Sequence, residues 1–276
     1  MHLYVERSKL KAAVPLGYEK HSQGFQRTTL VDHTVGSVHQ GTGICELKPG
    51  GSVDACAHAN EEGIYVFEGE LEMMRGSEAF RLSADDYALI PYGIPHAYRN
   101  RGDKVVRWFE VLAPQPKPPG GWQDTFFIGD VHWPKEMIKP NFEDPRTRLL
   151  GHFTEGGRYS GIRIRGLTTY HFMNRNFGAQ LFLLMRGELA PGGTLGPHDH
   201  PIEECYYSLS GELEFEMEGK IYQLRPGDMT WTGVGARHTW RNKGNVPYRW
   251  IETHVPELPE QYGIRDLADW DKLRNL

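Results

Sequence analysis

Three histidines and a glutamate stand at short, regular intervals in the second half of the chain. His198, His200 and Glu204 lie close together, and His238 follows after the turn GVGAR. Because alternate side chains of a strand share one face, these spacings place the first three on the same side. With His238 arriving from another strand, three imidazoles and a carboxylate would surround one point and leave positions open for water, substrate or dioxygen. The pattern predicts one divalent transition metal, and Fe, Mn, Ni, Cu and Zn all suit these ligands.

The same pattern occurs upstream with one change. At one constant offset, His58 aligns with His200, Glu62 with Glu204 and His96 with His238, and the turn glycines align as well. Cys56 stands where the second copy has His198. A repeat at fixed offset indicates two copies of one fold.

Two interpretations of the upstream set remain open. Cys56, His58, Glu62 and His96 could form a second site for a softer metal, because thiolate is a good ligand for Zn, Cu or Fe. Alternatively, Cys56 packs as a small apolar side chain while His58 and His96 hydrogen-bond Glu62. We expect the second arrangement, with the complete metal site in the second copy only.

We expect β-strands to position these side chains, because the sequence predicts strands along most of the chain. Short runs of β-branched and aromatic residues recur about every ten residues with Gly, Pro, Asp or Asn between them. The clearest runs are residues 63–73, 87–93, 105–113, 181–189, 205–217 and 248–255. Helical periodicity is confined to residues 264–276 and, more weakly, 134–139. The spacing favours an antiparallel sandwich or barrel.

Composition excludes several classes of function. The 276 residues carry a formal net charge of −5, which provides no field for nucleic acid. No apolar stretch approaches the length of a membrane span and no signal sequence is evident, so we expect a cytoplasmic protein without membrane contact. Three cysteines without CxxC spacing do not suggest a disulfide scaffold. Cys45 and Cys205 are expected to be packing residues.

The two copies resemble the cupin family. The second copy has both cupin motifs, with Gly233 where the family usually has proline. The first copy departs from the motifs at Cys56 and at Asp85. The residues that carry the resemblance are Gly192, His198, His200, Glu204, Gly211, Gly227, Gly233, Gly235, His238 and Asn242, and upstream Gly50, Cys56, His58, Glu62, Gly69, Asp85, Pro91, Gly93, His96 and Asn100.

This resemblance implies an all-β bicupin: two tandem double-stranded β-helix (cupin or jelly-roll) barrels with few peripheral helices. We expect an N-terminal barrel at 1–125, a Pro- and Gly-rich linker at 126–160 and a C-terminal barrel at 161–276. Aromatic barrel faces suggest a homo-oligomer.

Side chains that share the ligands' face are candidates for a substrate pocket. Strand parity places Tyr206 and Trp240 inside the second barrel, and Trp231, Met185, Tyr222 and Trp250 are candidates from neighbouring strands. Such a mouth suits a planar, moderately apolar small molecule. Arg237 could orient a substrate carboxylate or be a solvated loop residue. Glu203 has the opposite parity to Glu204 and is expected to face outward or toward a neighbouring strand.

Three functions agree with these features. Bicupins that resemble this chain include non-haem dioxygenases of flavonols, gentisate-like aromatics or diketones, and this oxidoreductase class is our first expectation. The second is a redox-neutral hydrolase, lyase or isomerase of the ureidoglycine aminohydrolase kind, although that motif begins with Glu and ends in Gln, where His198 and His238 stand here. The third is a non-catalytic binding bicupin, which the retained ligands disfavour. Oxalate decarboxylases share the ligand set but are expected to have two intact barrels or to be secreted.

Overall fold

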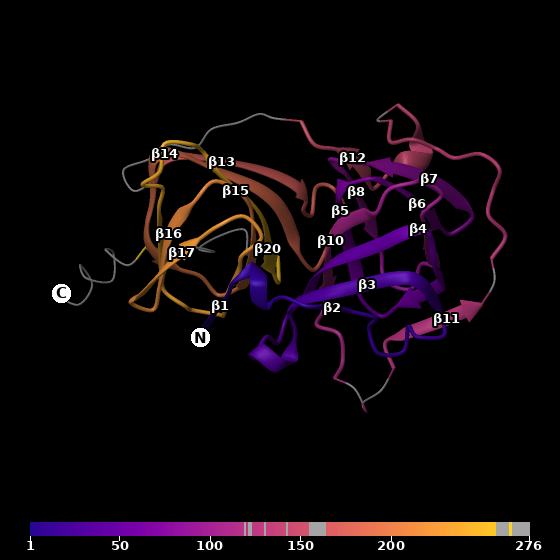
Figure 1. Cartoon of the computed structure of the whole chain (residues 1–276), viewed down its shortest axis with the longest axis horizontal. Helices are drawn as coiled ribbons and strands as arrows, with labels where there is room; N and C mark the ends of the chain where they lie inside the picture. The colour runs from indigo at the N-terminus through magenta and orange to yellow at the C-terminus, as the bar shows by residue number, and fades with distance from the viewer. Residues whose placement is uncertain are drawn as a thin grey trace.

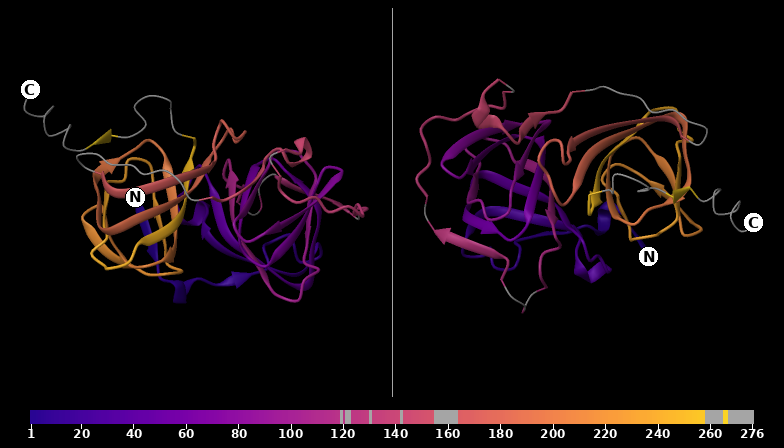
Figure 2. Two further views of the ribbon diagram at one scale, coloured as in Figure 1. Left: turned by 90° about the horizontal axis from the view of Figure 1, so that it is seen from above. Right: turned by 180° about the vertical axis from the view of Figure 1, so that it is seen from behind.

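Two β-sheets, each curled on itself, form the molecule (Figure 1). The structure is a computed structural model, and it describes residues 1–118, 120, 123–129, 131–141, 143–154 and 164–257, together with the backbone of 265–266. The two curled sheets lie side by side, and Figure 2 shows the same pair from two further directions. The protein is therefore all-β with two tandem barrels, as the sequence predicts.

The first sheet has eleven strands in the order β12-β8-β5-β10-β4-β9-β6-β7, with β11 and β3 paired to β4 and β2 paired to β3. Its strands are β2 (Ala12–Ala13), β3 (Ser22–Val31), β4 (Gly41–His58), β5 (Glu61–Glu68), β6 (Glu70–Arg75), β7 (Glu78–Ser83), β8 (Asp86–Ile90), β9 (His96–Arg99), β10 (Val106–Ala113), β11 (Thr125–Gly129) and β12 (Leu150–His152).

The second sheet has ten strands in the order β1-β18-β15-β20-β14-β19-β16-β17, with β13 and β21 paired to β14. Its strands are β1 (His2–Val5), β13 (Ile164–Met173), β14 (Leu183–Asp199), β15 (Glu203–Ser210), β16 (Leu213–Met217), β17 (Lys220–Leu224), β18 (Met229–Thr232), β19 (His238–Arg241), β20 (Tyr248–Val255) and β21 (Arg265–Asp266). From β18 onward this order repeats the path from β8 to β7 in the first sheet. The sequence repeat is thus a repeat of topology.

Helices are few in the described part of the chain. Three short 3₁₀ helices occur: η1 (Arg7–Lys9), η2 (His33–Val35) and η3 (Pro145–Thr147). The helix predicted at 134–139 is wrong, because Ile138 instead forms a β-bridge with Phe80 and is buried against the first core. Pro140, directly after this segment, disfavours the helical conformation at Lys139. The helix predicted at 264–276 lies outside the described residues, apart from the backbone of β21.

Two strands pair across the predicted domain boundaries. The boundaries themselves stay a prediction. The N-terminal strand β1 pairs with β18 of the second sheet. Within the predicted linker, β12 pairs with β8 of the first sheet. Figure 1 shows β1 beside the orange strands of the second barrel.

A hydrophobic core lies between the barrels and joins them. Buried side chains from both sheets meet in it, among them Ile44 and Phe109 from the first and Leu184 and Trp231 from the second. Each barrel also has a core of its own, around Trp108 in the first and Trp250 in the second. No helix within the described ranges has the length and apolar character needed to cross a membrane.

Candidate metal centres

The predicted donors of the second copy meet inside the C-terminal barrel. His198 lies near the end of β14, His200 follows it, Glu204 is on β15 and His238 begins β19, and all four side chains are buried. His198 and His238 are direct partners in the strand register. The turn before His238 is held by the amide of Gly235 (φ 70°), which donates to the carbonyl of His200 at 2.9 Å. Glycine tolerates this left-handed conformation without a steric cost.

The three imidazoles are oriented as metal ligands. Nδ1 of His198, His200 and His238 lies 2.8, 3.2 and 2.9 Å from the carbonyl oxygens of Gly196, Ile202 and Ala236. A proton on each Nδ1 leaves the lone pair of Nε2 free, which is how backbone carbonyls orient metal-bound histidines. One ring nitrogen from each histidine lies within 4.8 Å of the others. Nε2 of His200 is buried and faces Glu204.

Burial and neighbouring charges shift the pKa values of the donors in the C-terminal barrel. Burial lowers the pKa of His198, and burial together with the charge of His198 lowers the pKa of His238 to about 3. Glu204 Oε2 lies 2.7 Å from His200 Nε2 and 3.3 Å from His238 Nε2. Burial alone would raise the pKa of Glu204, but the neighbouring histidines hold it well below its usual range. Glu204 in turn raises the pKa of His200 against the effect of burial, so the neutral imidazole is favoured at His198 and His238, and His200 is paired with an ionised carboxylate.

A fourth histidine, which the motif spacing did not indicate, lies at this site. His254 lies opposite Glu204 in the register of β15 and β20, with Nε2 3.1 Å from Glu204 Oε1 and 2.7 Å from Glu252 Oε1. Trp250 Nε1 donates to the other oxygen of Glu252 at 2.7 Å. Burial opposes the charge, but Glu252 and Glu204 raise the pKa of His254 to about 10. Glu204, Glu252 and His254 also form a group with possible metal-ligand spacing.

Alignment of the two copies does not indicate this histidine, because the position that matches His254 in the first copy is Leu112. A usable signal existed in the run YRWIETHV, where Trp250, Glu252 and His254 alternate along one face of a strand.

The candidate pocket residues divide into two groups. Tyr206 and Trp240 are buried inside the barrel, where the Tyr206 hydroxyl donates to Glu204 and the two rings meet edge to face at 5.0 Å. Met185 is buried opposite Glu252 in the register, so it shares the inner face. Trp250 lies against Trp240, with ring centroids 4.8 Å apart. Tyr222 packs instead with Tyr4 at the edge of the second core.

Trp231 and Arg237 lie apart from the other pocket candidates, and for Arg237 the structure agrees with the alternative of a solvated loop residue. Trp231 pairs with Cys205, whose parity is opposite to that of Glu204, and it packs in the core between the barrels. Arg237 is exposed, and its backbone amide donates to Glu218 at 2.6 Å. Glu203 turns away from the donors, as parity predicts, and accepts hydrogen bonds from Ser37 and Val38 of the first barrel at 2.6 and 2.8 Å.

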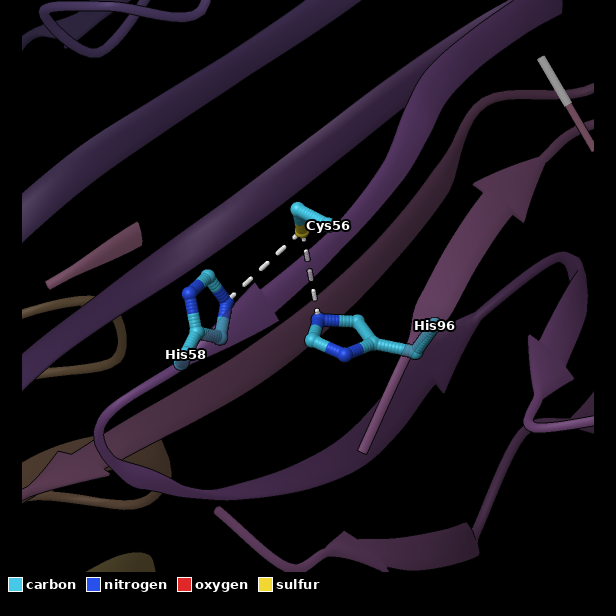
Figure 3. A group of neighbouring side chains, drawn as sticks. All are labelled: Cys56, His58 and His96. Atoms are coloured by element: carbon cyan, nitrogen blue, oxygen red, sulfur yellow. Dashed lines mark hydrogen bonds between the residues drawn. The ribbon is translucent and has the colours of Figure 1, made fainter. Parts of the chain in front are cut away.

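The upstream set also converges, inside the N-terminal barrel. Cys56 and His58 lie on β4, Glu62 on β5 and His96 on β9, and Figure 3 shows the thiol and the two imidazoles pointing toward one another. Cys56 Sγ is 3.6 Å from His96 Nε2 and 4.0 Å from His58 Nε2. Glu62 Oε2 is 3.0 Å from His96 Nε2 and 3.5 Å from His58 Nε2.

In the upstream set, the thiol, the carboxylate and the two imidazoles each stabilise the charged form of their neighbours. Burial alone would raise the pKa of Cys56, but His96 and His58 lower it to about 7. Burial likewise opposes the charge on His58, yet Cys56 and Glu62 raise its pKa to about 9. The same contacts raise the pKa of His96, against burial, and keep that of Glu62 low.

Comparison with known proteins agrees with this architecture. The Cupin domain family matches residues 43–112 and again 185–254. The chain is 38% identical over 104 residues to "Polyketide synthase CurC" of Streptomyces cyaneus, covering 37% of this chain and 68% of that protein. It is 26% identical over 244 residues to "Quercetin 2,3-dioxygenase" of Bacillus subtilis (strain 168), covering 75% and 70%.

A solved structure shares the whole arrangement of the fold. The oxalate decarboxylase of Lactobacillus farciminis, in a formate complex, aligns with a TM-score of 0.70 over 98% of this chain and 90% of that chain, at 18% identity. Two family matches, each covering one barrel with its donor set, show that the chain belongs to the cupin family and is a bicupin.

Proposed function

We propose that this protein is a metal-dependent enzyme, a non-haem dioxygenase that acts on a planar or aromatic small molecule in its C-terminal barrel. The observation that carries the proposal is the convergence of His198, His200, Glu204 and His238, with every Nδ1 held by a carbonyl and with Nε2 of His200 and His238 directed at Glu204. Bound there, an Fe, Mn, Ni, Cu or Zn ion would supply Lewis acidity, and a redox-active one would also supply dioxygen chemistry.

The charge of the donor set favours an anionic substrate oxygen. Three neutral imidazoles and one carboxylate leave one positive charge on a divalent ion. In a buried site this charge attracts an anionic ligand strongly. A phenol or enol that can ionise would provide one, whereas an apolar hydrocarbon would not.

The walls of the site favour a planar molecule. Tyr206, Phe215 and Trp240 meet edge to face beside His238, with centroid separations between 5.0 and 5.6 Å among the three rings. Aromatic walls with a few polar groups are typical of sites for planar ligands. The 26% identity to a quercetin 2,3-dioxygenase over most of the chain supports the same class of substrate.

A redox-neutral reaction is the second candidate, and His254 is the observation that favours it. The buried pair of His254 and Glu252 lies directly behind Glu204 and could hold a proton for a hydrolase, lyase or isomerase.

Dioxygen dependence separates the two candidates. The chain would be loaded in turn with Fe, Mn, Ni, Cu and Zn and incubated with flavonols, gentisate-like aromatics and diketones, with product followed by mass spectrometry and O2 by an electrode. We expect turnover with at least one phenolic or enolic substrate, matched by O2 uptake and lost under anaerobic conditions.

His200→Ala should abolish binding of the C-terminal metal and turnover, while His132→Ala, at an exposed position, should change neither. Turnover that continues unchanged without O2 would reject the dioxygenase and leave the redox-neutral reaction.

A further inference from the structure

A cleft between the two barrels combines three arginines with two stacked aromatic rings. Its volume is about 360 Å³, which lies in the range of roughly 300–1,000 Å³ typical of small-molecule sites. We propose that this cleft binds a small aromatic carboxylate, at a site separate from both donor sets. This inference does not depend on the reaction of the C-terminal barrel.

Both barrels and the N-terminal segment contribute to the cleft. Arg107 comes from β10 of the first barrel, Arg186 from β14 of the second and Arg7 from η1. None of the side chains of either donor set is among the residues that line it. The three guanidinium groups therefore line one cleft only because the two barrels pack side by side.

Arg7 offers the cleft a cation without an anionic partner. Its backbone amide donates to Asp228, whereas no carboxylate of the described residues lies within ion-pair distance of its guanidinium. The aliphatic part of the side chain runs over Gly227, where an added Cβ would lie 2.5 Å from Arg7 Cδ. Gly227 thus leaves the space that Arg7 occupies beside the cleft.

Arg186 is held in place and keeps donors for a ligand. Its guanidinium lies over the ring of Phe153, 4.5 Å from the centroid. Nη1 lies 3.4 Å from the Tyr65 hydroxyl and 3.5 Å from Asp85 Oδ1, and both distances are long for a hydrogen bond. Both contacts involve Nη1, and a guanidinium has N–H groups on two further nitrogens that can donate to a planar oxyanion.

Positive charge exceeds negative charge among the side chains that line the cleft. Three arginines face two carboxylates, Glu68 and Asp85, which leaves one positive charge. Arg107 is paired at 2.9 Å with Glu46, outside the lining, and more loosely with Glu68 at 3.4 Å. Because the Glu68 side chain is 57% exposed, water screens that contact. The lining therefore suits an anion with a single charge, such as one carboxylate.

The apolar side of the cleft favours an aromatic body on this ligand. Phe67 of the first barrel and Tyr207 of the second stack with their ring centroids 5.8 Å apart and an interplanar angle of 29°. Both rings, together with Leu209, are partly buried against the core between the barrels. A flat ring can lie on this surface while its carboxylate contacts the arginines, because aromatic rings and guanidinium groups both stack on aromatic side chains.

Titration calorimetry of the full chain with 2-naphthoate tests the proposal. We expect a saturable site that is present in the wild type and kept in His200→Ala, because the cleft does not need the C-terminal donors. Arg7→Gln keeps the aliphatic stem over Gly227 and removes the charge, so the affinity should fall about tenfold. Arg225→Gln is the matched control. Arg225 is exposed, lies two residues before Gly227 and is not part of the lining, so the affinity should stay unchanged.

A charge change in the opposite direction makes the test independent of folding defects. Glu68→Gln removes an exposed carboxylate beside Arg107, so 2-naphthoate should bind about threefold more tightly, a gain that partial unfolding would not produce. The neutral analogue 2-naphthalenemethanol and inorganic phosphate should both bind more weakly than 2-naphthoate. The proposal would be overturned by a wild type without a saturable site, by equal affinities of Arg7→Gln and the wild type, by no gain in Glu68→Gln, or by tighter binding of either comparison compound.

Discussion

Single side chains distinguish two barrels that share one topology. Cys56 and His198 occupy matching positions, as do Leu112 and His254. At these two positions the first barrel has a thiol and an aliphatic side chain where the second has imidazoles. The two barrels therefore differ in chemistry at a few matching positions of the same fold.

His254 is the residue whose substitution should be most informative for the C-terminal site. His254→Leu copies the first barrel and removes the partner of Glu204 Oε1 at 3.1 Å. Groups that orient a metal ligand typically contribute about 10–100-fold in metal affinity or activity. We expect a loss of that size in metal affinity, measured by competition with a chelating dye, with the fold retained. His132→Leu, at an exposed position, is the control, and unchanged affinity in His254→Leu would show that this contact does not position Glu204.

Asp85 combines backbone strain with a specific contact. Its φ is 69°, where the second copy has Gly227, and its carboxylate accepts a hydrogen bond from Tyr65. Alanine at this position would lose the hydrogen bond and keep the backbone strain. Glycine would also lose the hydrogen bond, but it would relieve the strain. Asp85→Ala should therefore be less stable than Asp85→Gly by about 1 kcal/mol in urea unfolding. If the urea unfolding curves of the two variants had the same midpoint and the same slope, the backbone strain at Asp85 would not be confirmed.

At the scale of elements, strand β1 depends on one carboxylate of the second barrel. Asp228 accepts from the amides of Arg7 and Arg225 at 2.8 and 2.9 Å and from the Tyr4 hydroxyl at 3.2 Å. This contact fixes the N-terminal segment across the edge of β18, an edge that would otherwise expose unpaired backbone groups.

Removal of this carboxylate should loosen the N-terminal segment. Asp228→Ala leaves several donors unsatisfied, so we expect a loss of about 1–3 kcal/mol in the free energy of unfolding and faster amide exchange in residues 2–5. Asp103→Ala, at an exposed loop position, should have neither effect. Unchanged exchange in β1 would mean that backbone pairing alone holds the strand.

At the scale of the molecule, matching contacts tie the barrels together in both directions. Glu203 accepts from Val38 of the first barrel, and its counterpart Glu61 accepts from the amides of Gln180 and Leu181 beside the second. Each of these glutamates directly precedes the glutamate of a candidate donor set, Glu204 or Glu62. The interface therefore reaches to within one residue of both donor sets.

Close packing across this interface should make the barrels unfold together. A Cβ added at Gly63 would lie 2.6 Å from Phe182, so Gly63→Ala should cost about 1–3 kcal/mol through overpacking. Phe182→Leu, introduced in the same chain, should restore part of that loss, which a double-mutant cycle by denaturant unfolding would measure. Strict additivity of the two changes would contradict direct packing. The expected homo-oligomer and cytoplasmic location stay predictions, and light scattering would test the first.

The strands and the repeat could be predicted from the order of the amino acids, and so could the candidate donors, because these follow from local periodicity and fixed spacing. Parity along a strand was enough to place His198, His200, Glu204 and Tyr206 on one inner face and Glu203 on the other. The pairing of distant strands could not be predicted in this way and is known only from the folded chain. It brought His254 behind Glu204, turned Trp231 into the core between the barrels and left Arg237 exposed, because register between distant strands depends on packing that no local pattern records.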